Sequence, residues 1–388
     1  MTSRELFCDV ICAAIFPRSH PMPEVRREQY SLLHEMLKSH ALTQLPGKLL
    51  QAEQMPEALR AQWQKEQLAQ KLRFGQYLME QDAVLRGFSH AEIPCAVLKG
   101  AVSASYYPEP AYRAMGDIDL LVRPCDRPKA VELLKSVGFQ EYGYQDAVEQ
   151  GFLRGTTVLE LHTGICEDGR INAYLLSHFG EMERKELCGY GFPCLMQRCN
   201  GLILLEHMHR HFRDALGFRQ VIDWMLYVDA HLDDDAWNTT MGSLFAEVGL
   251  KQFAIAVTAM CQRYFGLRTE EITWTRDADG ALCQELFEHI YVMGNFGQSL
   301  EANSKTAASM LRDRSLWQVL KGLQKVGLDN WALCRKLPWL KPFAWLYQSF
   351  LYLYRIIAEG YNMSLALVKQ ERRRVAKTLE LMKKLDLS

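Results

Sequence analysis

Two hydrophobic periodicities divide the chain. Over residues 1–90, apolar positions recur at intervals of three and four, for example in EQYSLLHEMLKSHAL and in the long run at 52–88, which is typical of amphipathic helices. The same spacing returns from about residue 172 and continues to the C-terminus. Between them, short apolar runs are bounded by glycine and proline, as in strands. We therefore predict a helical region at 1–90, a mixed domain at 91–195 and a helical region at 196–388.

The mixed domain begins with a short apolar run that ends in Lys-Gly, IPCAVLKGA. A helix candidate AVSASYY, the strand candidate DIDLLV and a helix in DRPKAVELLKSVGF follow, the last with proline near its start and glycine after its last turn. Further strand candidates are FQEYGY and TTVLELHTG. The predicted fold class is α+β, with a small mixed sheet embedded between helical regions.

Composition limits the classes of function. The chain has 388 residues, of which 48% are hydrophobic and 23% charged, which predicts a globular protein of more than one domain. Its 45 basic and 46 acidic residues give a net charge of −1. Without a global field, any binding to nucleic acid or to an anionic membrane must be local.

The cysteines and the apolar runs indicate the compartment in which we expect the protein and whether it spans a membrane. The eleven cysteines form no CxxC pair, so we expect reduced thiols, a cytoplasmic location, and neither a disulfide framework nor a thiolate zinc site. Charges interrupt the N-terminal run MTSRELFCDVICAAIF, which predicts a buried helix instead of a signal peptide. Polar residues also break the aromatic run at 342–361, so we predict no membrane span there.

The run MGDIDLLV places two acids one residue apart in an apolar strand. Side chains alternate along a strand, so Asp117 and Asp119 share one face. Two adjacent carboxylates are unfavourable unless a cation neutralises them, and such oxygen ligands suit Mg²⁺ held with phosphates. Glu160, between Leu159 and Leu161 in a second strand candidate, offers a third carboxylate. Three acids on adjacent strands could bridge two divalent ions, as in nucleotidyl transfer.

Three histidines accompany these acids. Alternation points His162 the same way as Glu160, so it could contact substrate or orient the carboxylate, or be a hydrogen-bonded interior residue. His207 and His211 lie four residues apart, the spacing of paired zinc ligands. No glutamate stands between them and no thiolate pair accompanies them, so we favour helix packing or a polar contact at the site over zinc.

The segment from VLKGAVSASYY through GDIDLLV to VGF, with LELHTGI and LLEHMHRHF after it, resembles the bacterial uncharacterised nucleotidyltransferase family of the DNA polymerase beta-like superfamily. The resemblance covers roughly residues 70–265. It implies a small mixed sheet with a D-x-D on one strand and a third acid on a neighbour. Asp117, Asp119 and Glu160 stand at those positions, as catalytic residues and ligands of Mg²⁺ or Mn²⁺.

The sequence departs from the superfamily at the phosphate-binding turn. Better-characterised members have Gly-Gly or Gly-Ser after an apolar residue, whereas this chain has Lys99 and Gly100. Lys99 could contact a phosphate as a point charge, and Gly100 could allow close backbone approach. Arg113 could reach a phosphate or pair with one of the acids. With Gly116, these are the predicted nucleotide-binding residues.

The predicted function is Mg²⁺-dependent transfer of a nucleoside monophosphate from an NTP to an acceptor, with release of pyrophosphate. The acceptor could be a protein, an RNA, a metabolite or a saccharide precursor. The alternative is a non-catalytic nucleotide-binding sensor or scaffold on the same fold.

The segment 342–385 combines an aromatic run with the basic tail KQERRRVAKTLELMKKL. Contact with a membrane surface or with RNA is one interpretation. Apolar positions at intervals of three and four in the tail also fit a helix that packs one face on the protein, and we favour this second interpretation from sequence.

Overall fold

The structure is a computed structural model, and it describes residues 1–47, 53–212, 216–294, 320, 323–324, 327–328, 331, 333–358 and 365–387. The chain forms two compact units, Met1–Gly297 with Leu385–Ser388, and Gln298–Lys384. We call them unit 1 and unit 2 and describe each by itself.

The N-terminal helices confirm the predicted helical spacing. Their bounds are α1 Ser3–Ile15, η1 Arg27–Gln29, α2 Tyr30–Ser39 and α3 Glu57–His90. A capping box starts α1, because the Thr2 hydroxyl accepts the Glu5 N–H while the Glu5 carboxylate accepts the Thr2 N–H at 2.7 Å. Residues 48–52, including the first residue of the run at 52–88, lie outside the described residues.

Seven strands form one mixed sheet in the order β3-β4-β5-β2-β1-β7-β6. The strands are β1 Cys95–Val97, β2 Ile118–Val122, β3 Gln140–Gln145, β4 Glu149–Arg154, β5 Thr157–His162, β6 Glu183–Leu187 and β7 Tyr190–Cys194. The helices between them are α4 Gly100–Ala104, η3 Pro110–Tyr112, α5 Arg127–Ser136 and α6 Gly169–Ser177. Only the β2–β5 and β1–β7 pairs are parallel. The predicted α+β class is therefore confirmed.

The prediction that helix resumes at about residue 172 was wrong for 183–194. There β6 and β7 form a hairpin at the edge of the sheet. Cys188 and Gly189 turn it with φ values of 52° and 84°, the conformation of a tight two-residue turn that Asn-Gly or Asp-Gly would have signalled. The charged sequence ERKEL gives this edge strand no apolar alternation.

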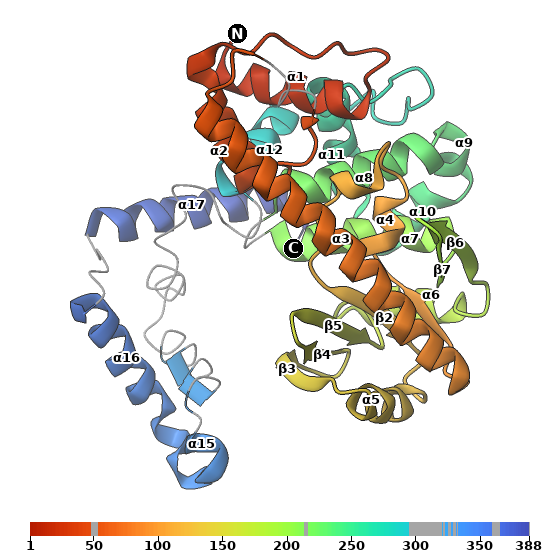
Figure 1. Cartoon of the computed structure of the whole chain (residues 1–388), viewed down its shortest axis with the longest axis vertical. Helices are drawn as coiled ribbons and strands as arrows, with labels where there is room; N and C mark the ends of the chain where they lie inside the picture. The colour runs from red at the N-terminus through yellow and green to blue at the C-terminus, as the bar shows by residue number, and fades with distance from the viewer. Residues whose placement is uncertain are drawn as a thin grey trace. The chain divides into compact units, whose positions relative to one another are not determined.

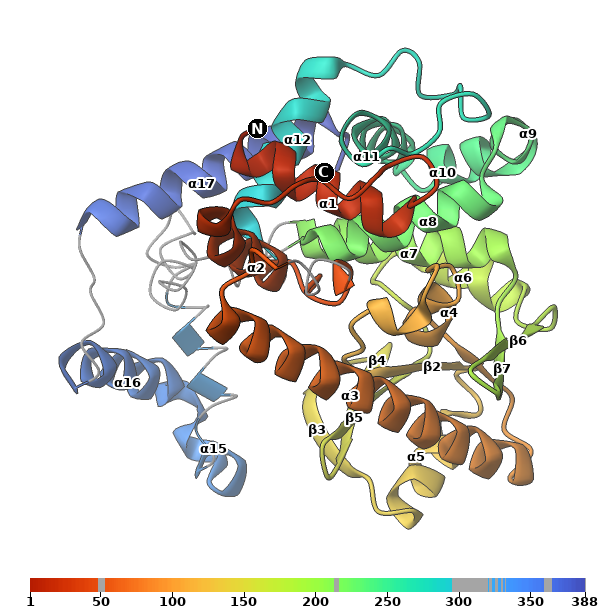
Figure 2. The same cartoon turned by 45° about the horizontal axis from the view of Figure 1, so that its top comes forward.

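The two faces of the sheet have different partners. Ile118, Leu120 and Val122 of β2 belong to an apolar core that includes Phe88 of α3 and Leu134 of α5. Figures 1 and 2 show the long helix α3 running past the sheet, with α5 below it. Since side chains alternate along β2, Asp119 and Leu121 point to the opposite face.

The remaining helices of unit 1 follow the sheet: α7 Gln197–Phe212, α8 Phe218–His231, α9 Asp234–Ala236, η4 Trp237–Met241, α10 Gly242–Glu247, α11 Lys251–Tyr264 and α12 Gly280–Met293. Helix α1 packs with the later part of this group: the Phe7 ring lies 5.6 Å from that of Phe218 and 5.8 Å from that of Tyr291. The first helix of unit 1 therefore completes its packing only with helices from the far end of the unit.

Unit 2 contains α15 Leu333–Lys336, η8 Pro338–Phe343, α16 Ala344–Ala358 and α17 Leu365–Lys384. Residues 359–361 of the aromatic run lie outside the described residues. Among the helices that the structure describes, none has the length and apolar character needed to span a bilayer.

Candidate active site

The parallel pairing of β2 with β5 brings the predicted acids together. Its register sets Asp119 opposite Glu160 and Leu121 opposite His162. Asp119 is buried, with 2% of its side chain exposed, whereas the Glu160 side chain is 27% exposed. Asp117 immediately precedes β2 and lines the same cavity as both. Carboxylates on adjacent strands thus converge at one place, as the alternation predicts.

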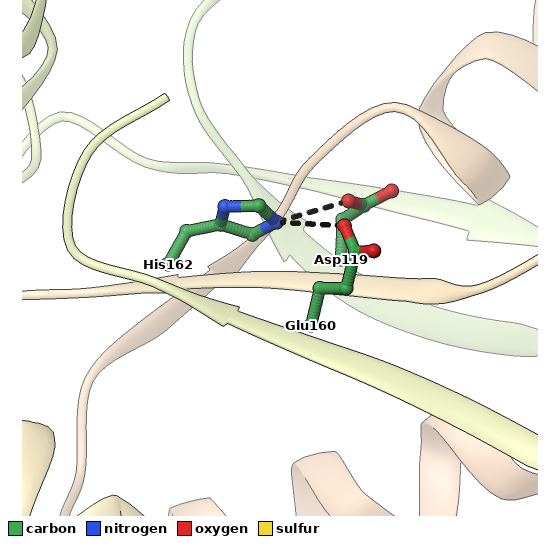
Figure 3. A group of neighbouring side chains, drawn as sticks. All are labelled: Asp119, Glu160 and His162. Carbon is green, nitrogen blue, oxygen red and sulfur yellow. Dashed lines mark hydrogen bonds and ion pairs between the residues drawn. The ribbon is translucent and has the colours of Figure 1, made fainter. Parts of the chain in front are cut away.

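His162 bridges the two strands (Figure 3). Its Nε2 lies 3.0 Å from Asp119 Oδ1 and 3.5 Å from Glu160 Oε2. Burial by itself lowers the pKa of His162, but the hydrogen bonds with Asp119 and Glu160 outweigh burial and raise the pKa to about 9. At neutral pH the ring is therefore protonated, so its Nε2–H donates to Asp119 and its charge pairs with Glu160.

Lys99 is a second cation on the same carboxylate. Its Nζ lies 2.9 Å from Asp119 Oδ1, the oxygen that also faces His162. Burial opposes ionisation of Asp119, yet the charge of Lys99 and the hydrogen bond with His162 hold the pKa of Asp119 well below its usual range. Burial alone would lower the pKa of Lys99, but the negative charges of Asp119, Asp117 and Glu160 raise it, and Asp119 contributes most. Asp119 is thus a permanent anion at neutral pH.

The Lys-Gly turn has an unusual backbone. Lys99 has a φ of 40° and Gly100 a φ of 34°, both in the left-handed region. A Cβ on Gly100 would overlap with the hydroxyl of Tyr77 on α3. Glycine is therefore required here by both conformation and space. Gly116 has no such constraint, since a Cβ there would meet nothing, and its exposed backbone lies outside the cavity lining.

The acids open onto a cavity of about 170 Å³. Its acidic side consists of Asp117, Asp119, Glu149 and Glu160. The rest of the lining, which we call the basic wall, comes from the Lys-Gly turn, from the segment before β2 and from α7 and α8: Lys99, Gly100, Arg113, His207, Arg210, His211 and Arg219. Carboxylates and basic side chains therefore line one small space, an arrangement that suits a polyanion bound together with a cation.

Arg113 is held by Asp223 of α8, a residue that we did not single out from sequence. Its Nε and Nη2 donate to Asp223 on α8 at 2.9 and 2.8 Å, and the hydroxyl of Tyr107 donates to the same carboxylate at 2.9 Å. The acid that pairs with Arg113 is thus neither Asp117 nor Asp119. The arginine nevertheless lines the cavity.

His207 and His211 lie side by side on α7, with ring centroids 4.5 Å apart. Burial, reinforced by the charge of Lys99, holds the pKa of His207 well below its usual range, so this ring is neutral at neutral pH. Within the described part of the chain, the group of three or more potential metal ligands that lie together is Asp119, Glu160 and His162. The predicted preference for a polar contact at the site over zinc stays a prediction.

Three further residues of the cavity were missed from sequence. Arg210 Nη2 lies 3.5 Å from Glu149 Oε2, and that oxygen lies 3.9 Å from His162 Nδ1. Arg219 donates to the carbonyl of Ala114 at 3.2 Å. For Arg210 a signal existed, because it stands one turn after His207 on the same helix. Glu149 lies in β4, a strand that we did not predict. Arg219 lies at the start of α8, where the sequence carries no motif.

The donor set fits a divalent cation. Asp117, Asp119 and Glu160 supply hard oxygen ligands that line one cavity at the sheet. The fold and the cavity together define an α+β protein of the nucleotidyltransferase class, in which acids on adjacent strands face a basic wall.

The chain belongs to the family described as uncharacterised nucleotidyltransferase, whose model matches residues 27–266. The match begins earlier than the predicted residue 70 and so includes η1, α2 and all of α3. Membership supports a role in nucleotidyl transfer. No curated protein matches the sequence. Among solved structures, an antigenic nucleotidyltransferase-like protein from Paracoccidioides brasiliensis is similar, with 14% identity over 50% of this chain and 93% of that chain and a TM-score of 0.33.

Proposed function

We propose that the protein is a Mg²⁺- or Mn²⁺-dependent enzyme that transfers a nucleoside monophosphate from an NTP to an acceptor hydroxyl or phosphate. Pyrophosphate is the leaving group. The observation that carries this proposal is the β2–β5 register, which sets Asp119 beside Glu160 and turns both toward a cavity with a basic wall.

Each group of residues has a role in this proposal. Asp117, Asp119 and Glu160 hold divalent ions, which when bound activate the attacking oxygen and neutralise the triphosphate. Lys99 and Arg113 contact the phosphates, and the ion pair with Asp223 keeps the guanidinium of Arg113 in place. His162 orients the carboxylates of Asp119 and Glu160.

The backbone of the Lys-Gly turn also has a role. The left-handed φ values at Lys99 and Gly100 and the close approach of Tyr77 fix its course. A turn so constrained keeps its shape when a phosphate approaches, which lowers the entropy cost of binding. Gly116, a predicted nucleotide-binding residue, is exposed beside the cavity. We propose that it contributes backbone freedom before β2 and makes no side-chain contact.

Pyrophosphate release tests the proposal. Purified protein is incubated with Mg²⁺ or Mn²⁺ and each NTP, with and without a desalted lysate as the acceptor pool. Glu160→Gln should reduce release at least about a hundredfold, equivalent to about 3 kcal/mol of barrier, while NTP binding is retained. Glu132→Gln, an exposed glutamate on α5, is the matched control and should leave release unchanged. Label transferred to an acceptor by wild type alone would identify that acceptor.

A non-catalytic nucleotide sensor or scaffold is the second candidate, and one observation favours it. Asp119 is already neutralised by Lys99 and His162, so the site holds its charge balance with this chain's own cations. Metal-dependent NTP binding without pyrophosphate release under any condition would select this candidate. Failure to bind any NTP would refute both.

Protein, RNA, metabolite and saccharide precursor are the acceptor classes to test. We further propose a cytoplasmic, bacterial protein. The eleven cysteines, all free thiols in the structure, support a reducing compartment.

A further inference from the structure

An aromatic stripe lies exposed on unit 2. It consists of Trp339, Phe343, Leu346, Phe350 and Tyr354, whose exposed fractions are 67%, 49%, 38%, 71% and 65%. Phe343, Leu346, Phe350 and Tyr354 follow one another at intervals of three and four from the end of η8 through α16, so these four share one side of the helix, and Trp339 precedes them in η8. Single exposed apolar residues are ordinary on protein surfaces, whereas a continuous face of this size marks an interaction site.

The opposite side of the same segment is packed. Ala344 is fully buried and Gln348 is 1% exposed. At the border of the stripe, the ring of Tyr347 stacks on that of Trp331 at 4.8 Å with 3° between the planes, so this border is held by the protein as well. The two sides of the segment therefore differ in burial: one side is packed inside the protein, and the aromatic stripe is exposed. The packing that we favoured from sequence concerned the basic tail, in which Met382 is 3% and Leu385 is 0% exposed.

Charge indicates what covers the stripe. Residues 331–358 contain Arg335, Lys336, Lys341 and Arg355 and not one aspartate or glutamate, although the whole chain balances 45 basic against 46 acidic residues. A partner that offers both apolar material and negative charge therefore matches this segment. The headgroup region of an anionic phospholipid layer does so, and tryptophan, tyrosine, lysine and arginine are the residues that concentrate there.

We propose that the aromatic stripe is a membrane-surface anchor for anionic phospholipid. Helix α16 lies in the plane of the interface, with Phe350 and Leu346 among the upper acyl chains and Lys341 at the headgroups. It does not cross the bilayer, in agreement with the lack of a spanning helix among the described residues. The basic residues of α17, in the sequence KQERRRVAK, add long-range attraction.

Flotation of the full-length protein with vesicles tests this proposal, which is independent of the proposed enzymatic function. Vesicles of phosphatidylcholine with phosphatidylserine are compared with vesicles of phosphatidylcholine alone. The wild type should float only with the anionic vesicles, and less so at high salt. Phe350→Asp should lower the partition coefficient at least about tenfold. Lys341→Gln should lower it about fivefold.

The matched control is Leu72→Asp on α3, because Leu72 is 66% exposed and lies in the other unit. It should float like the wild type, and equal melting temperatures of the variants would show that all are folded. Three results would overturn the proposal. The first is no flotation with either vesicle, and the second is equal flotation with both. The third is that Phe350→Asp impairs self-association or the binding of single-stranded RNA and leaves flotation unchanged.

Discussion

Replacing Lys99 with methionine tests how far Asp119 depends on a buried ion pair. The two side chains are 13% and 2% exposed, and their charged atoms lie 2.9 Å apart. Methionine retains a long unbranched side chain with a Cβ, so the left-handed backbone at this position, with φ 40°, is strained equally in both proteins. The substitution therefore removes the charge and little else.

The magnitude follows from burial. Removing one partner of a buried ion pair costs about 3–5 kcal/mol, because the other charge is left without compensation. His162 remains 3.0 Å from the same Asp119 oxygen, so we expect the lower end, about 3 kcal/mol. For a unit of this size, each kcal/mol lowers the melting temperature by about 2–4 °C. Thermal unfolding followed by circular dichroism should show a decrease of about 6–12 °C.

A matched control separates burial from distance. Lys135 lies 2.7 Å from Glu141, closer than the buried pair, but these side chains are 51% and 42% exposed. Surface pairs contribute about 0–1 kcal/mol, so Lys135→Met should change the melting temperature little. If Lys99→Met melted within about 1 °C of the wild type, or no lower than Lys135→Met, the reasoning from the buried pair would be refuted.

Three further predictions concern the same cavity. Gly100→Ala should destabilise unit 1 by more than about 1 kcal/mol, because its Cβ would overlap with the Tyr77 hydroxyl, and Tyr77→Phe in the same chain should restore part of the loss in a thermal melt. Arg113→Met should cost about 3–5 kcal/mol by leaving Asp223 buried without its bidentate partner; Arg113→Lys should not restore full stability in urea unfolding, because lysine lacks the planar fork. The pKa of His162 is raised from 6.5 to about 9 in the folded protein, so its stabilising contribution is complete below pH 6.5 and is lost as pH rises through about 9. The melting temperature of metal-free protein should therefore fall as pH rises through this range. If the melting temperature of a His162→Gln variant fell equally with pH, the assignment to His162 would be contradicted.

The local features of the fold were predictable because they depend on local sequence. Helical spacing located α1, α2 and α3, and apolar runs bounded by glycine and proline located β1, β2 and β5. The hairpin of β6 and β7 was not predictable, because its turn uses Cys188 in a conformation that sequence rules assign to asparagine or glycine. Strand β6 also lies at the edge of the sheet, where charged side chains replace the alternation of apolar and polar residues on which strand prediction rests.

The candidate site was predictable to the extent that strand alternation fixes direction. Alternation alone placed Asp119 on one face of its strand, and Glu160 with His162 on one face of theirs. What it could not give was the partner of Arg113: Asp223 is 110 residues away in sequence, and its position depends on how α8 packs. The second cation on Asp119 was equally hidden, because Lys99 reaches it only through the left-handed turn.

The packing of α1 against α8 and α12 has a consequence for biosynthesis. Phe7 leaves the ribosome early, but Phe218 and Tyr291, which contact it, are translated much later. At about 5–20 residues per second, the interval is on the order of 10 to 60 seconds. Throughout it, α1 has α2 and His40 as native partners but not α8 or α12, so part of its apolar face stays exposed and open to chaperones. A nascent chain arrested before residue 218 should leave α1 open to proteolysis, and one that has emerged past residue 293 should protect it.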